Sequence, residues 1–539
     1  MPETISPLVL FRNQTFRMLW VAALASNFGG LVQAVGAGWL MTSLSSSERM
    51  VALVQGSVTL PIMVFSLLAG VFADNFDRRL VMLIAQGFMF AVSIVLTVLA
   101  YFGLLTPWSL LAFTFLIGCG TALHNPSWQA TMGDIVSREE LPSAVSLNSM
   151  GFNLMRSVGP AAGGAIVALA GAAAAFLVNA LSYIAIIMAL FRWRAPVRDT
   201  RLPPEPMGSA FAAGLRYVAM SPNLIRVILR GFLFGLSGVA LLALLPVVVR
   251  VTLDGSALLY GAMLGCFGAG AVGGALLNAH LRARFINEQI ARGAFLGLAL
   301  CCGIVGHSPY APVSGVALLL GGACWVLAMS MFNVTVQLST PRWVVGRALA
   351  LFQTGTFGGM AIGSWLWGAI AQHSNPGTSL TWALVLLVGG AFIGMRLPLP
   401  EFGTLNLDPL NRFREPALRL DLNYRSGPVM VMVDYVIDQS DVSEFLEAMS
   451  ERRRVRIRDG AQQWTLLRDL EKPEHWSESY HVPTWGEYVR HNQRRTHADA
   501  ALSDRIRALH RAPGLPTVHR MIERQTVALH DDMRLQPNG

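Results

Sequence analysis

The stretch "LPIMVFSLLAGVFADNFDRRLVMLIAQGFMFAVSIVLTVLA" (residues 60–100) contains two apolar runs separated by a short charged loop. The first run begins near residue 51 and the second ends near residue 103, so both exceed the roughly 20 apolar residues that a membrane-spanning helix needs. The loop carries Asp74, Asp77, Arg78 and Arg79. The stretch therefore predicts two spanning helices joined by a polar turn.

The whole chain follows this pattern. Of its 539 residues, 53% are hydrophobic and only 14% are charged, and the mean hydropathy is +0.49. Soluble proteins carry about 25% charged residues, so the composition indicates a membrane protein. Apolar runs of spanning length predict twelve helices, at residues 16–42, 51–73, 80–103, 107–131, 143–170, 172–191, 227–249, 257–280, 289–306, 311–337, 345–371 and 378–396.

A polar stretch at 192–209 splits these runs into six and six. The predicted fold is an all-α membrane protein of two six-helix bundles, followed by a small soluble α+β domain. The predicted division is a first bundle (1–195), a central loop (196–226), a second bundle (227–398), a linker (399–427), the α+β domain (428–525) and a tail (526–539).

Arginine placement predicts the orientation. An even number of spans puts both termini on one side, and eighteen arginines of the first 400 residues fall on that side. Only Arg49 and Arg250 fall on the other side, and Arg156 lies inside a span. Because arginine-rich loops stay in the cytoplasm, we expect both termini to be cytoplasmic. The basic excess belongs to apolar segments, so no nucleic-acid partner is expected.

The two halves of the membrane part resemble each other. Three motifs recur at offsets of 204 to 208 residues, namely Gly70-x-x-x-Asp74 as Gly274-x-x-x-Asn278, Asn125-x-x-x-Gln129 as Asn333-x-x-x-Gln337, and Gly151/Gly159/Gly164 as Gly355/Gly363/Gly368. Parallel repeats of six helices are typical of one large class of transporters.

The charged loop has two interpretations. It either stops two helices from sliding into lipid, or it forms a latch in which Asp74 pairs with Arg78, Arg79 or a helix N-terminus. Gly70 lies one turn before Asp74 and would let a neighbouring helix approach closely. In the second interpretation the latch holds the bundles together on one face and opens when they rock apart.

These motifs resemble known ones. "GVFADNFDRR" (70–79) resembles the loop motif between spans two and three of the major facilitator superfamily, and "RSVGPAAGG" (156–164) resembles the span-five motif of its exporters. "NFGGLVQAVGAGWLMTSL" (27–44), "HNPSWQA" (124–130), "LNSMGFNLMRSVGPAAGG" (147–164) and the C-terminal region resemble the transmembrane secretion effector group, which includes enterobactin-type siderophore exporters and macrolide efflux proteins. The resemblance implies export of a small amphipathic or anionic compound, such as a siderophore or antibiotic, across the bacterial cytoplasmic membrane by alternating access.

Arg156 is the sharpest candidate for a substrate contact. It lies near the middle of span five, where an uncompensated arginine costs at least about 2.5–3.5 kcal/mol. It either binds an anionic substrate or is held structurally by polar neighbours. Gly159 and Pro160 follow it and would permit a bend that takes part in gating.

Buried amides are the other substrate-binding candidates. They either contact the substrate or bridge helices, and they are Asn27, Gln33, Asn125, Gln129, Asn333 and Gln337. His124 either carries a coupling proton or packs as a neutral ring.

No cofactor or metal is expected. The five cysteines lie in apolar runs without zinc-type spacing. Lys472 is the only lysine of the chain, so a phosphate-binding Gly-x-x-x-x-Gly-Lys loop is impossible and ATP hydrolysis by that route is excluded. The energy must then come from a gradient or from a partner.

The C-terminal region predicts a strand at 429–437, a helix from 441, strands within 462–470 and 476–482, and a helix at 484–510. This order resembles the dimeric ferredoxin-like domains of the antibiotic-biosynthesis monooxygenase and haem-degrading type, which implies dimerisation. No catalytic residue is assigned there, and the arginines at 452–458 are interpreted as a solvated helix end rather than an anion site. A membrane-anchored enzyme and an importer are the competing functions, and the expected partners are a small-molecule substrate and membrane lipid.

Overall fold

The computed structural model describes residues 7–75, 77–136, 140–193, 207–341, 343–400 and 415–523, together with residues 407, 410 and 413. The surroundings of Gly70 and Asp74, two of the predicted gating residues, lie outside this description, although both belong to a helix. The chain forms two compact units. The first comprises residues 1–207, 225–336 and 349–401, and the second comprises residues 208–224, 337–348 and 402–539.

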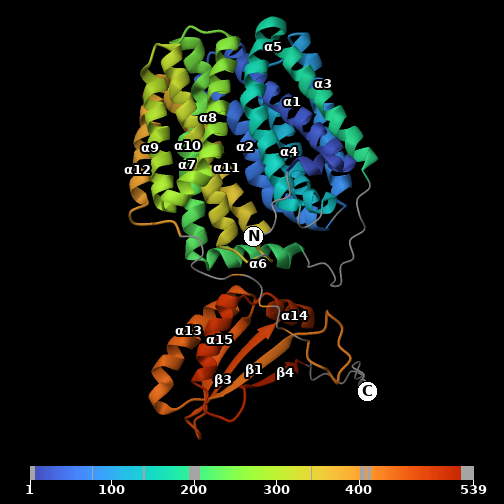
Figure 1. Ribbon diagram of the computed structural model, residues 1–539, viewed down its shortest axis with the longest axis vertical. Helices are drawn as coiled ribbons and strands as arrows, with labels where there is room; N and C mark the ends of the chain where they lie inside the picture. The colour runs from blue at the N-terminus through green and yellow to red at the C-terminus, as the bar shows by residue number, and fades with distance from the viewer. Residues whose placement is uncertain are drawn as a thin grey trace. The chain divides into compact units, whose positions relative to one another are not determined.

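The first unit consists of long helices (Figure 1). They are α1 (Gln14–Leu44), α2 (Glu48–Asn75), α3 (Arg78–Tyr101), α4 (Pro107–Ile135), α5 (Leu141–Arg192), α7 (Pro222–Val247), α8 (Ala257–Arg284), α9 (Asn287–His307), α10 (Ala311–Leu338), α11 (Val345–His373) and α12 (Pro376–Ile393). A short 3-10 helix (Pro7–Arg12) precedes α1, and a π-helix (Val248–Thr252) follows α7.

Helix α5 contains two spans. Gly171 interrupts it with a φ of +77°, a backbone conformation that glycine adopts without strain. Among the described residues, ten helical segments are long and apolar enough to cross a membrane, and α5 counts once among them. Division of α5 at Gly171 raises the ten to eleven, whereas α11 (Val345–His373), although 29 residues long, is not among these apolar segments, so the twelfth predicted span stays a prediction.

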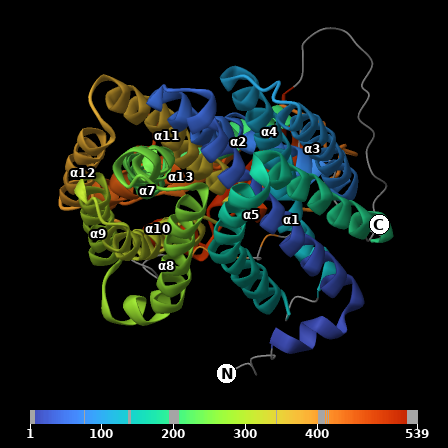
Figure 2. The ribbon, with the colours of Figure 1, turned by 90° about the horizontal axis from the view of Figure 1, so that it is seen from above.

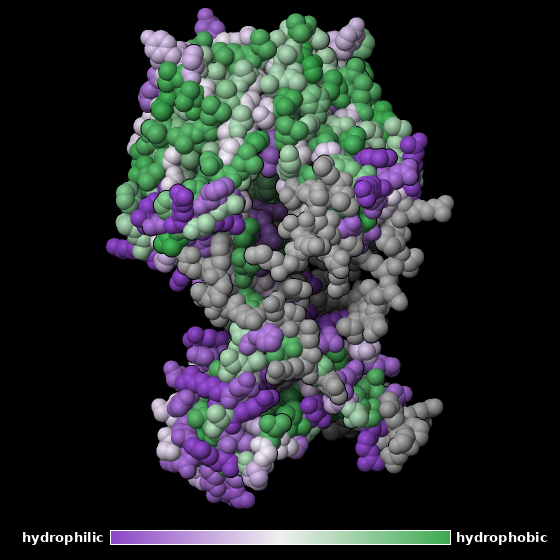
Figure 3. All heavy atoms as spheres, viewed as in Figure 1, coloured by the Kyte–Doolittle hydropathy of each residue, from purple (hydrophilic) through white to green (hydrophobic). Residues whose placement is uncertain are grey.

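The helices form two groups. Seen from above, α1 to α5 lie on one side and α7 to α12 on the other (Figure 2). Figure 3 shows that the helices present mainly hydrophobic side chains on the face drawn there. Such a surface is unfavourable in water and suits contact with lipid chains.

The second unit contains a four-stranded antiparallel sheet in the order β2-β3-β1-β4. Its strands are β1 (Val429–Val436), β2 (Gln462–Arg468), β3 (His475–Val482) and β4 (Thr517–Ile522). The helices α13 (Val442–Arg458), α14 (Trp485–Gln493) and α15 (His497–Ala508) pack on the sheet around buried residues such as Phe445 and Ile506. The elements β1, α13, β2 and β3, followed by a helix, appear in the β-α-β-β-α order that the sequence predicted, and the sheet order is ferredoxin-like.

Three features of this unit differ from the prediction. The helix expected at 484–510 is two helices, α14 and α15. Thr496 is the N-cap of α15, where its side chain accepts a hydrogen bond from the amide of Asp499, so a new helix begins there. Strand β4 was not predicted. Helix α6 (Met207–Ala219) forms within the expected central loop.

Helix α6 and residues 337–348 contact the sheet domain inside the second unit. The guanidinium of Arg458 lies 5.1 Å from the ring centre of Tyr217 in α6, and the guanidinium of Arg494 lies 4.2 Å from that of Trp343. The rings of Tyr217 and Trp343 also meet edge to face at 5.7 Å. The second unit is therefore assembled from three separate pieces of chain.

Candidate functional site

The two bundles of the first unit meet closely where α5 crosses α8. A Cβ atom placed on Gly164 would lie 2.7 Å from the Cα atom of Gly261, which is too close for any side chain. Gly268 faces the backbone of Arg156 in the same way. Small residues allow such close helix contact in membranes. Glycine at positions 164, 261 and 268 therefore lets the backbones of α5 and α8 touch where the bundles meet.

Polar and aromatic contacts join the bundles at the side where α1 ends and α2 begins, which we call the distal side. Arg250, in the π-helix after α7, donates hydrogen bonds to the carbonyl oxygen of Thr42, to Oγ1 of Thr42 (2.9 Å) and to Oγ of Ser43 (3.3 Å). The rings of Trp39 and Tyr260 stack with their centres 6.1 Å apart. The bundles are therefore held together on the distal side.

A second seam joins α2 to α11. Oγ of Ser66 lies 2.8 Å from Oγ1 of Thr354, and Oγ of Ser47 donates to Oε1 of Gln372 at 3.0 Å. Ser47 directly precedes α2 and Ser66 lies 19 residues after it, within α2, so α2 and α11 run side by side.

Arg156 lies at the end of the α5–α8 seam that is farther from the distal side. Its side chain is half-buried, and the guanidinium carbon is 5.4 Å from the ring centre of Phe267. In the part of the chain that the structure describes, no carboxylate forms an ion pair with it. Beyond Gly268, α8 packs instead on α10, where Gly270 meets the backbone of Leu319. Arg156 therefore sits where contact between α5 and α8 ends, without a described counter-charge.

Gln33 belongs to a buried amide network. Its Oε1 accepts hydrogen bonds from Nδ2 of Asn179 and from Oγ of Ser93 (3.4 Å), and Nδ2 of Asn179 also donates to Tyr183 Oη at 3.1 Å. The network joins α1, α3 and the second half of α5. These contacts are those of a helix-bridging amide, and a substrate contact of Gln33 stays a prediction.

The remaining predicted amides are more accessible. Asn125, Gln129 and Gln337 are exposed, whereas Asn27 and Asn333 are half-buried. They lie on α1, α4 and α10, and their role in binding stays a prediction.

His124 packs against an aromatic neighbour. Its ring is stacked 6.0 Å from that of Trp128, whose Nε1 donates to Asn148 Oδ1 at 3.2 Å. Nδ1 of His124 is buried and has no hydrogen-bond partner among the described residues. A packed ring fits these contacts, and proton coupling stays a prediction.

The charged loop after α2 ties helices of the first bundle together. Asp77 caps α3 by accepting from the amide of Arg79 at 2.9 Å. Arg78 pairs with Asp134 at the end of α4 at 3.0 Å. The guanidinium of Arg79 donates to the carbonyl oxygen of Leu190 at 2.8 Å. These contacts of Arg78 and Arg79 stay within one bundle, and the latch between bundles stays a prediction.

The bend expected at Gly159 and Pro160 stays a prediction. The backbone of α5 stays helical through Pro160, and Gly171 is the residue with non-helical angles. A Cβ atom on Gly159 would lie 2.9 Å from that of Leu31. Gly159 therefore serves close packing of α5 on α1 in this conformation.

A buried ion pair that sequence analysis missed lies in the second bundle. Nη2 of Arg230 is 3.2 Å from Oε1 of Glu288, and their side chains are 1% and 9% exposed. Oε2 of Glu288 accepts from the amide of Leu399 at 3.2 Å, and Arg230 donates to the carbonyl oxygen of Leu397 at 3.5 Å. The pair therefore fixes the segment that contains Leu397 and Leu399, after α12, against α7 and α9. Glu288 is the only acidic residue between Asp254 and Glu401, and that was the available signal.

Two bundles of spanning helices that meet along glycine-rich seams define a multi-pass membrane transporter of the major facilitator type. The sequence also matches the family described as transmembrane secretion effector over residues 5–526. The chain therefore belongs to the transmembrane secretion effector family.

Two relatives illustrate the similarity. The staphyloferrin A transporter of Staphylococcus aureus (strain NCTC 8325 / PS 47) is 26% identical over 285 residues, which cover 52% of this chain and 71% of the relative. The enterobactin exporter EntS of Salmonella typhimurium is 29% identical over 374 residues, which cover 68% of this chain and 84% of the relative.

Solved structures agree on the fold. A bacterial homolog of the human lysosomal transporter Spinster, inward-facing and occupied, has a TM-score of 0.57 at 14% identity and covers 73% of this chain and 99% of that chain. An auto-inhibited POT family peptide transporter has a TM-score of 0.58 at 12% identity, with 75% and 98% covered.

Proposed function

We propose that this protein exports a small anionic or amphipathic compound of the siderophore type across the bacterial cytoplasmic membrane by alternating access. The observation that carries the proposal is Arg156, a cation between two bundles with no described carboxylate partner. Relatives that transport staphyloferrin A and export enterobactin support the substrate class.

Arg156 has the chemistry to recognise such a substrate. Its guanidinium offers a planar fork of donors and a permanent charge, which suit carboxylates and catecholates. In a site with little water, charge-assisted hydrogen bonds of this kind are strong enough to orient the substrate. Asn27, Asn125 and Gln129 would supply neutral hydrogen bonds.

Alternating access follows from the two seams. In this conformation the bundles touch on the distal side and also between α2 and α11, at Ser66 and Thr354, and the α5–α8 contact ends at Arg156. Rocking of one bundle against the other would separate Gly164 from Gly261 and open the distal side. We assign both termini to the cytoplasm, because arginine-rich loops lie on their side, so distal opening releases the substrate outside.

The C-terminal domain, proposed at residues 428–525, is assigned no chemistry of its own. The ferredoxin-like sheet supports a role in dimerisation, by resemblance to domains that pair in this way. The energy source is proposed to be an ion gradient.

Export by cells tests the proposal. Cells with and without the protein are loaded with a labelled catecholate or carboxylate siderophore, and efflux is measured with and without a proton uncoupler. Arg156→Lys keeps the charge but loses the fork, so we expect a higher Michaelis constant. Arg156→Ala should nearly abolish efflux of the anion. Arg396→Lys, at an exposed position after α12, is the matched control.

The choice of compound separates a binding role from a structural one. If Arg156 contacts the anion, efflux of a neutral or cationic drug falls less than efflux of the siderophore. Equal loss for every compound, or absence of the variant from the membrane, would contradict the assignment of Arg156 as a ligand.

A further inference from the structure

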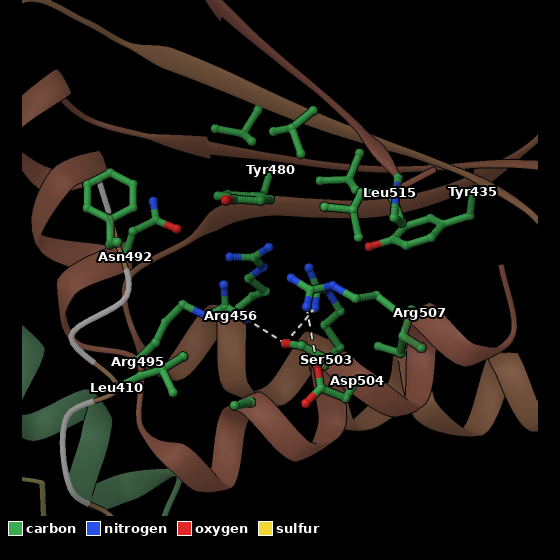
Figure 4. Close-up of a pocket in the computed structure, with 18 of the residues that line it drawn as sticks. Leu410, Tyr435, Arg456, Tyr480, Asn492, Arg495, Ser503, Asp504, Arg507 and Leu515 are labelled. Carbon is green, nitrogen blue, oxygen red and sulfur yellow. Dashed lines mark hydrogen bonds and ion pairs between the residues drawn. The ribbon is translucent and has the colours of Figure 1, made fainter. Parts of the chain in front are cut away.

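A cavity of about 510 Å³ lies inside the second unit, between its sheet and its helices (Figure 4). Val433 of β1 and Tyr480 of β3 form part of the sheet side, and residues of α13 and α15 form the opposite side. Small-molecule sites have volumes of about 300–1,000 Å³, so the space suits a compound of modest size.

The cavity wall carries more positive than negative charge. Five arginines line it, whereas Asp504 is the one acidic side chain among the described residues of its lining. Asp504 is already engaged in an ion pair with Arg507 at 3.2 Å. Arg520 is exposed to solvent, whereas the other three arginines, at positions 452, 456 and 495, are partly or fully buried and need compensation from elsewhere.

Two of them share one buried carboxylate. Arg452 Nε and Arg456 Nε lie 2.8 Å and 3.1 Å from the two oxygens of Glu478, which is fully buried behind the lining. The guanidinium of Arg456 also lies 4.5 Å from the ring centre of Tyr480, and its Nη1 donates to Nε2 of His491 at 2.9 Å. Burial and the charge of Arg456 hold the pKa of His491 well below its ordinary value, so the ring is neutral. One positive charge of the pair therefore stays uncompensated.

Arg495 adds a second uncompensated charge. Its Nη2 donates to Oγ of Ser503 at 2.5 Å, and Arg452 Nη1 reaches the same oxygen at 3.4 Å (Figure 4). No carboxylate forms an ion pair with Arg495 in the part of the chain that the structure describes. Burial, followed by repulsion from Arg456 and Arg452, lowers the pKa of Arg495 to about 10, and the group is still protonated at neutral pH.

We propose that this cavity binds a small aromatic carboxylic acid, with its carboxylate among Arg452, Arg456 and Arg495 and its ring against Tyr480 and Val433. Partly buried arginines without a counter-ion are unfavourable, and an anion placed between them removes that cost. A purely structural ion pair accounts for Arg452 and Arg456 with Glu478, but it leaves Arg495 unexplained.

Calorimetry on the full-length protein in detergent tests the site. The probe is salicylate, and its neutral amide salicylamide is the matched ligand control. We expect salicylate to bind and salicylamide to bind much more weakly. Arg495→Met should weaken salicylate binding at least about tenfold, or about 1.4 kcal/mol, and Arg495→Lys should retain more affinity. Arg505→Met, on the outer face of α15 where Arg505 pairs with Glu444 and Glu447, should bind as the parent protein does.

Two further measurements guard the interpretation. The unfolding temperature of each variant without salicylate shows whether the domain is intact. If Arg495→Met unfolds the domain, the affinity of Arg495→Lys for salicylate is measured instead. Arg156→Ala separates this site from the membrane site, because binding in the cavity should persist in that variant. Competition by a compound exported in the cell assay would mark the cavity ligand as cargo, and its absence would mark another cytoplasmic acid of the same class.

The proposal is overturned if salicylate fails to bind the parent protein at millimolar concentration. It is also overturned if salicylamide binds equally well, or if salicylate binding is lost in Arg156→Ala but kept in Arg495→Met. The last result would leave the proposed transport function intact and remove only the cavity site.

Discussion

Replacement of Glu478 by glutamine should strongly destabilise the C-terminal domain. Glu478 is fully buried and accepts hydrogen bonds from Arg452 Nε (2.8 Å), Arg456 Nε (3.1 Å), Trp464 Nε1 (3.0 Å) and Tyr435 Oη (3.1 Å). Glu478→Gln keeps the shape but leaves two buried guanidinium groups without a counter-charge.

The pKa of Glu478 gives the size of the effect. Burial alone would raise it, but the charges of Arg456 and Arg452 and the hydrogen bond from Trp464 outweigh burial and hold the pKa at about 2 instead of 4.5. At about 1.4 kcal/mol for each pKa unit, this difference corresponds to about 3–4 kcal/mol. Removing one partner of a buried ion pair costs a similar amount, about 3–5 kcal/mol.

The sign of the pH dependence follows from the same values. Because the folded-state pKa lies below the unfolded-state value, the stabilisation is complete above a pH of about 4.5 and is lost as the pH falls toward about 2. At neutral pH the whole contribution is therefore present, and Glu478→Gln removes it.

Hydrogen exchange on the full-length protein measures this loss. Protected amides of β1 and β3 should exchange about three hundredfold faster in Glu478→Gln, as expected for about 3–4 kcal/mol. The control is Glu447→Gln, whose side chain is 68% exposed and pairs with Arg505. Exposed pairs contribute at most about 1 kcal/mol. Equal exchange in the two variants would refute the assignment of Glu478 as the anchor of the domain.

The membrane part offers three more tests. Gly164→Val places a branched side chain against Gly261, so the distal side should fail to close and transport should fall at least about tenfold at normal membrane levels. Arg250→Gln removes the charge-assisted hydrogen bonds to Thr42 and Ser43, which at this exposed position contribute at most about 1 kcal/mol, and spin-label distances across the distal ends of the bundles should then lengthen. Arg230→Met leaves Glu288 buried and unpaired at a cost of about 3–5 kcal/mol, which lowers the unfolding temperature in detergent, whereas adding Glu288→Leu should restore most of it. Unchanged transport, distances or unfolding temperature would contradict the respective contact.

The sequence predicted the membrane helices well because their signal is local. A run of apolar residues long enough to span lipid needs no information about its neighbours. The predicted spans 143–170 and 172–191 even bracket Gly171, the residue at which α5 breaks. The predicted strand at 429–437 likewise rests on alternation within one segment, and β1 follows it.

Features that depend on distant partners were missed. Strand β4, "TVHRMI", is almost wholly exposed and lacks a buried alternation, so its pairing with β1 supplies the structure. The prediction of a solvated arginine run holds for Arg453 and Arg454, which are exposed. It is wrong for Arg456, which is 7% exposed, and for Arg452 and Arg458, which form ion pairs and whose side chains are 12% and 18% exposed. The partner of Arg456, Glu478, lies 22 residues away, and no spacing rule connects them. Arg250 and Thr42 are 208 residues apart, and no sequence pattern predicts their contact either.

The assembly of the second unit from three pieces of chain has a mechanical consequence. Tyr217 belongs to the connection between the two bundles, and Trp343 belongs to the connection between α10 and α11. Both rings nevertheless form cation–π contacts with arginines of the sheet domain. A protease cut between residues 402 and 427 would break only the covalent connection that leads into the sheet domain. The domain would remain attached through the contacts of Arg458 with Tyr217 and of Arg494 with Trp343. Any motion that separates these two connections must break the contacts of Tyr217 and Trp343 with the arginines, so the sheet domain opposes that motion.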